Sequence, residues 1–95
     1  MIKHIVAFKL MNPAEAERVK AHLMELDGAI DVIRLWDVGI NIGTSSKPYE
    51  VVVYSVFDNL GDLEIFRDHA KHIQVKNAIA GYIETSGTID YESDL

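Results

Sequence analysis

Two histidines three residues apart form the first pattern in this sequence that is suited to chemistry. His69 and His72 lie in the segment DHAKHIQVK, and histidine is the side chain that most readily changes charge near neutral pH. On a regular helix, His72 shares a face with Val75, Ile79 and Tyr82. An apolar border can bring the pKa of an imidazole close to working pH, as acid–base catalysis requires. His72 is therefore our candidate catalytic residue, and the alternative is a structural histidine at a helix start.

The other histidines have different expected roles. His4 lies on the apolar face of the opening segment MIKHIVAFKL, where it either lines a pocket or sits hydrogen-bonded in the core. A cavity shared by His4 and His72 would favour function for both. We expect His69 to cap or pack at the helix start and His22 to lie at the surface or at a dimer rim.

Metal and nucleotide chemistry have little support in the sequence. His69 and His72 supply only two ligands, whereas a catalytic zinc ion takes three from the protein, and Asp68 points elsewhere on a helix. The sequence has no cysteine, neither glycine-rich nucleotide motif, and no paired carboxylates on an apolar face. We expect no metal and no cofactor.

Composition excludes several classes of protein. The 95 residues make one domain, 1–95, with 48% hydrophobic and 25% charged residues, as in globular chains. Nine basic against fifteen acidic residues argue against nucleic acid, whose phosphates need clustered Lys and Arg. No apolar run approaches the roughly 20 residues of a membrane span, and no signal peptide opens the chain. We expect a cytoplasmic protein without membrane contact.

Hydrophobic periodicity predicts the elements that position these side chains. Alternating apolar and polar residues indicate four strands, over 1–10, 35–42, 49–57 and 84–92. One helix runs from the cap Asn12 to Asp27-Gly28, another follows the cap Asn59, and a last helix carries His72. The order β-α-β-β-α-(α)-β indicates an α+β fold, with a four-stranded antiparallel sheet and the helices on one face. The acidic end, 90–94, is expected in solvent or against a partner.

The third predicted strand is apolar on both faces. One face carries Val51, Val53, Ser55 and Phe57, and the other carries Val52, Tyr54 and Val56. Because the helices cover only one face of such a sheet, something else must cover the other. The simplest cover is the same sheet of a second copy, so we expect a homodimer.

Several segments together resemble a known family. The opening KHIVAFKL, the segment VGIN at 38–41, the strand YEVVVYSVF, the segment HAKH and the closing IDYE resemble the stress-responsive A/B-barrel (Dabb) domain along essentially the whole chain. The resemblance implies a ferredoxin-like α+β subunit that pairs through its sheet into a dimeric α+β barrel. Most members have no assigned activity. A few act on polyketides without a cofactor, through a Tyr–His pair in a cavity between helices and sheet.

The resemblance also assigns roles to residues of this chain. The catalytic histidine of those relatives corresponds to His72, and a pocket histidine of their first strand corresponds to His4. Their catalytic tyrosine corresponds to Phe66, which has no hydroxyl, and a second pocket histidine corresponds to Val51. Half of the Tyr–His pair is therefore missing, and the same reaction by the same groups is not expected.

The resemblance also raises the possibility of a magnesium site. Some relatives hold this ion through backbone carbonyls after the first helix, at positions that correspond to the surroundings of Asp27, Ile30 and Ile33. Such a site depends on loop conformation, so the sequence leaves it open.

We expect a cleft between helices and sheet for a small apolar or aromatic ligand, and the sequence leaves open whether the protein is an enzyme. His72 would supply acid–base chemistry. The predicted lining is His4, Val6, Phe8, Val19, Leu23, Val53, Phe66 and Ile79. One alternative is a non-catalytic, stress-related dimer with a packed interior. Another is a monooxygenase-like member of the α+β barrel group, which rests on fold analogy alone.

Overall fold

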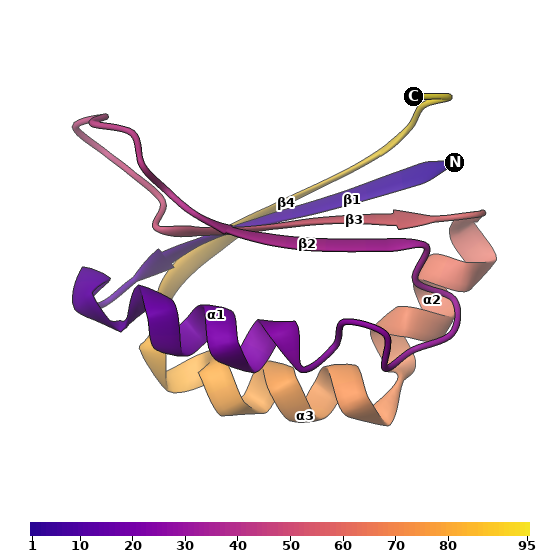
Figure 1. Cartoon of the computed structure of the whole chain (residues 1–95), viewed down its shortest axis with the longest axis horizontal. Helices are drawn as coiled ribbons and strands as arrows, with labels where there is room; N and C mark the ends of the chain where they lie inside the picture. Colours follow the sequence, from indigo (N-terminus) through magenta and orange to yellow (C-terminus); the bar gives the residue numbers. More distant parts are fainter.

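The computed structural model describes all 95 residues and confirms the predicted order of elements. Three helices lie on one side of a four-stranded sheet, and the loop between β2 and β3 rises on the other side (Figure 1). The sheet has the strand order β2-β3-β1-β4, and all neighbouring strands are antiparallel. The strands are β1 (Ile2–Leu10), β2 (Leu35–Ile40), β3 (Val51–Phe57) and β4 (Ile83–Glu92). The helices are α1 (Ala16–Met24), α2 (Leu60–Asp68) and α3 (Ala70–Ile79), with short 3-10 turns at Pro13–Glu15 and Ala80–Tyr82.

Side-chain caps start the helical segments. The Asn12 side chain accepts the Ala14 N–H at 3.0 Å, but the first turn is 3-10, so α1 begins only at Ala16. The Asn59 side chain accepts the Asp62 N–H at 2.8 Å and starts α2 as predicted. Both caps satisfy N–H groups that a helix leaves without partners at its start.

Cross-strand register separates the two faces of the sheet. His4, Val6 and Phe8 of β1 lie opposite Ser55, Val53 and Val51 of β3, on the face that the helices cover. On the other side of β1, Asp90, Thr88 and Ser86 of β4 lie opposite the same three residues. Most of β4 is exposed, so the helices leave its inner face uncovered. The space between α3 and β4 is therefore open to solvent.

The end of β1 is closed by a buried carboxylate. The β1–β4 register shifts between Lys9 and Leu10, and the Leu10 N–H donates to Oε1 of Glu50 at 2.6 Å. Glu50 is only 8% exposed. The Leu10 N–H points to the β3 side of β1, like the Phe8 carbonyl that accepts the Glu50 N–H, and the Glu50 side chain gives this buried N–H its partner.

Much of the outer face of the sheet stays uncovered in the single chain, although Lys3 and Val56 on this face are only 4% and 5% exposed. The register places Ile5, Ala7, Val52 and Tyr54 together on this face, and Val52 is 39% exposed. At its edges Leu35, Ile89 and Tyr91 are all exposed. None of the helices combines the length and apolarity that crossing a bilayer would require.

Candidate functional site

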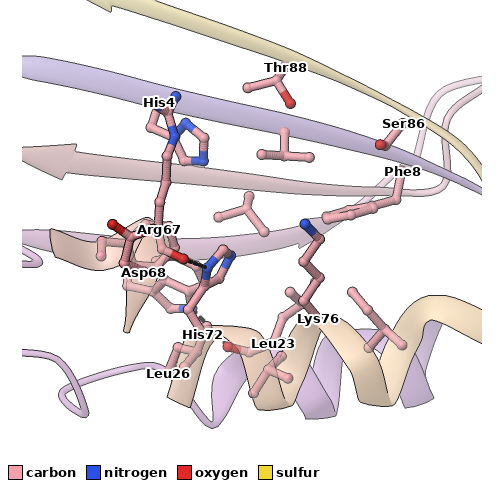
Figure 2. A pocket seen from close by; sticks show the side chains of 16 residues that line it. His4, Phe8, Leu23, Leu26, Arg67, Asp68, His72, Lys76, Ser86 and Thr88 are labelled. Atoms are coloured by element: carbon pink, nitrogen blue, oxygen red, sulfur yellow. Dashed lines mark hydrogen bonds between the residues drawn. The ribbon is translucent and has the colours of Figure 1, made fainter. Parts of the chain in front are cut away.

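A cavity of about 630 Å³ lies between the helices and the inner face of the sheet. Figure 2 shows the strands above it and α3 below it, with side chains entering from both sides. The predicted residues that line it are His4, Val6, Phe8, Leu23, Val53, Phe66, His72 and Ile79. The structure thus brings both histidines into one apolar space.

Val19 does not line this cavity. The side chain belongs to the hydrophobic core and is 0% exposed, because neighbouring side chains enclose it completely. Leu23, one turn further along α1, belongs to the same core but also lines the cavity.

His72 enters the cavity from the first turn of α3 (Figure 2). Its Nδ1–H donates to the Arg67 carbonyl at 3.0 Å, and no protein group is hydrogen-bonded to Nε2. Burial lowers the pKa of His72; the bond to the Arg67 carbonyl opposes this, and the charge of Lys76 adds to the lowering. The imidazole is therefore neutral at neutral pH and offers the Nε2 lone pair as a base.

His4 is held by a carboxylate that sequence reasoning missed. His4 is only 7% exposed, and its Nδ1–H donates to Oδ1 of Asp90 at 2.5 Å. The other carboxylate oxygen of Asp90 accepts from Arg67 at 2.5 Å, and Arg67 also bonds Glu64 at 2.5 Å. Asp90, the first residue of the acidic end, is exposed as expected, but it also bonds two residues that line the cavity. The sequence gives no signal for this contact, because Asp90 meets His4 only through the register of β1 and β4.

Phe66 lies between the two histidines. Its ring centroid is 5.9 Å from that of His4 and 4.3 Å from that of His72. Phe57 and Trp36 complete this aromatic cluster. The hydroxyls of the cavity come instead from Ser86 and Thr88 of β4, which we did not predict.

His69 is a capping residue, as predicted. Its Nδ1 accepts the Lys71 N–H at 3.0 Å at the start of α3, outside the cavity lining. His22 pairs with Glu25 at 3.1 Å on the surface of the chain. Val51, which the resemblance matched to a second pocket histidine, is buried and also lies outside this cavity.

The residues present do not fit a metal ion. No three His, Asp or Glu side chains lie close enough together to hold one. At the turn after α1, the Ile30 carbonyl accepts the Ile33 N–H at 3.1 Å. The neighbouring Ala29 carbonyl accepts the Lys71 ammonium at 3.2 Å. A positive side chain already bound at this turn opposes a divalent cation there.

Comparisons with known proteins agree with this architecture. The family model of the stress responsive A/B barrel domain matches residues 2–93. A dimeric protein of unknown function and ferredoxin-like fold from Bacteroides fragilis NCTC 9343 is 32% identical, with 97% of this chain and 95% of that chain covered and a TM-score of 0.82. A dimeric ferredoxin-like protein of unknown function from Thermobifida fusca YX is 22% identical, with 97% and 90% covered and a TM-score of 0.84.

An enzyme is also among the similar structures. Hydroxynitrile lyase from Passiflora edulis is 14% identical, with 99% of this chain and 94% of that chain covered and a TM-score of 0.80. At this identity the likeness shows the fold alone. No curated protein matches the chain.

Proposed function

This chain belongs to the stress responsive A/B barrel (Dabb) domain family, and we propose that it is a homodimer whose subunits each bind a small apolar or aromatic ligand. The ligand site is the cavity between helices and sheet. In it His72 acts as a general base that needs no cofactor. The observation that carries the proposal is the entry of His4 and His72 into one cavity of about 630 Å³.

The cavity has the properties of a small-molecule site. Ligand pockets span about 300–1,000 Å³ and combine apolar walls with a few polar groups that fix orientation. Nine of the sixteen lining residues here are hydrophobic, and the polar ones come from both the helices and the sheet. A volume of this size supports a ligand site over a non-catalytic dimer with a packed interior. The monooxygenase-like alternative rests on fold alone.

The chemistry follows from the two imidazoles. His72 takes a proton at Nε2, and the Arg67 carbonyl holds its Nδ1–H throughout, so the ring is oriented and the imidazolium has a partner. Asp90 fixes the Nδ1–H of His4 and leaves Nε2 as the nitrogen available to a ligand. Because Phe66 has no hydroxyl, no Tyr–His pair operates, and water or ligand groups must complete the proton transfer.

Proton exchange gives a direct test of this base. A small aromatic β-diketone carries an acidic C–H, and its exchange with deuterium is followed by NMR in the presence of the protein. We predict that His72→Ala slows protein-catalysed exchange by about 10²–10⁴-fold, the usual contribution of a general base. His22→Ala is the matched control, because His22 lies on the surface of the chain. Equal exchange rates for wild type and His72→Ala would refute the mechanism.

A second copy of the outer face completes the proposed dimer. Among the apolar residues there, Val52 is 39% exposed and Tyr54 is half-buried, so neither is fully covered within one chain. A sheet with two apolar faces needs two covers, and an isologous contact between identical sheets supplies the second. The dimeric B. fragilis protein, 32% identical over almost the whole chain, supports this assembly.

A further inference from the structure

Lys76 is a free cation in the cavity. Besides the histidines, two basic side chains line this space, Arg67 and Lys76. Arg67 is neutralised, since it forms ion pairs of 2.5 Å with both Glu64 and Asp90. Lys76 has no ion pair and no side-chain hydrogen bond within the chain. Lys76 is exposed at the open side of the cavity, where it offers a positive charge in a chain of net charge −6, which on the whole repels anions.

The position of Lys76 relates it to the proposed base. His72 and Lys76 are four residues apart on α3, so they share one helix face with their Cβ atoms about 5–6 Å apart. Figure 2 shows the Lys76 side chain rising from α3 towards the sheet, with Phe8 and Ser86 above it. Asp68 lies on the other side of His72 in this view. The cavity therefore has an anionic end at Asp68 and a cationic end at Lys76.

Hydroxyl groups face the cationic end from the opposite wall. Ser86 and Thr88 lie two residues apart on β4, so both point to the same face of the sheet and line the cavity. An ammonium and hydroxyl donors together match the oxygens of a carboxylate, and hydrogen bonds to a charged group are the stronger kind.

We propose that Lys76, with Ser86 and Thr88, forms a carboxylate subsite, so that the ligand is an apolar or aromatic acid rather than a neutral molecule. This inference rests on the proposed function, since it names the ligand class of the same cavity. The carboxylate binds at the open, β4 side, and the apolar part packs between Phe8 and the helices. The reacting atom then lies about one helical turn away, at His72.

A pair of matched probes tests the subsite. Binding of 2-naphthoate and of the uncharged 2-naphthamide is measured by titration calorimetry at neutral pH and low ionic strength. We expect wild type to bind naphthoate about three- to tenfold more tightly than naphthamide, as a partly exposed ion pair with hydroxyl donors allows. Lys76→Gln should remove this preference and leave naphthamide binding unchanged.

Two further variants separate this inference from the proposed function. Lys71→Gln is the matched control, because Lys71 is on the same helix but bonds the Ala29 carbonyl outside the cavity, so the preference should persist. His72→Ala should also keep the preference while it loses proton exchange. Equal affinities of wild type for both probes, or a preference that survives Lys76→Gln, would overturn the subsite and leave His72 chemistry standing. If neither probe binds, the cavity is no site for aromatic ligands and both proposals fail.

Discussion

At the scale of single residues, the environment of His72 decides what the site can do. Half-burial against Phe66 favours the neutral ring, and the Arg67 carbonyl selects the tautomer that carries its proton on Nδ1. A base in this state is ready at neutral pH without a partner carboxylate. His4 differs, because Asp90 holds it, and it is better suited to orient a ligand than to exchange protons freely.

Titration of His72 is a direct consequence of that environment. We predict that its pKa in the folded protein lies below the ordinary value of about 6.5, chiefly because of burial. The unfolded chain then binds the proton more readily, so the contribution of neutral His72 to stability is complete above about 6.5 and is lost as the pH falls towards its folded pKa. NMR titration of the His72 ring protons measures the midpoint. A midpoint at or above 6.5 would contradict this account.

Residue patterns in the sequence were sufficient to predict part of the cavity lining. His72 and Ile79 follow the helical period of α3, and His4, Val6 and Phe8 follow the alternation of β1, so their common direction could be predicted. Asp90 could not be assigned in this way, because it lies 86 residues from His4 and meets it only through strand register. Lys76 was also missed, since an exposed lysine on a helix is ordinarily a solvated one.

At the scale of elements, the pairing of β1 with β4 assembles the site. This register places Asp90 opposite His4, and Thr88 and Ser86 opposite Val6 and Phe8. The alternation of β4 was visible in the sequence, but its partner and register were not. Similarly, the sequence predicted helix starts at Asn59 and His69. It did not predict the 3-10 turn before α1, because an Asn cap such as Asn12 can precede a 3-10 turn as well as an α-helix.

Removing the carboxylate from β4 tests this pairing. We predict that Asp90→Ala lowers the free energy of unfolding by about 1–3 kcal/mol, because it leaves a buried imidazole nitrogen of His4 without its partner. Urea denaturation followed by circular dichroism measures the change. Glu92→Ala is the control, since Glu92 is exposed at the next position along the same face of β4. Equal effects of the two substitutions would show that the His4–Asp90 bond does not stabilise the site.

At the scale of the whole molecule, the sheet divides the protein into a site and an interface. Its inner face and the helices line the cavity, and its outer face carries the apolar residues that we assign to a second copy. A single chain of 95 residues buries a small core, so covering the outer face also adds stability that the monomer lacks. The sequence alone predicted that both faces of β3 are apolar. Which residues of the outer face remain exposed could be learned only from the structure.

The mass of the protein in solution tests most directly whether the outer face of the sheet binds a second copy. Sedimentation equilibrium at micromolar concentration should give twice the 10.7 kDa of one chain, and Val52→Asp, on the outer face, should shift the protein towards the monomer. Ile42→Asp is the control, because Ile42 is 98% exposed in the loop between β2 and β3. The account predicts a dimer for wild type and for Ile42→Asp. A well-folded wild-type monomer of 10.7 kDa, stable with its outer face in water, would contradict it.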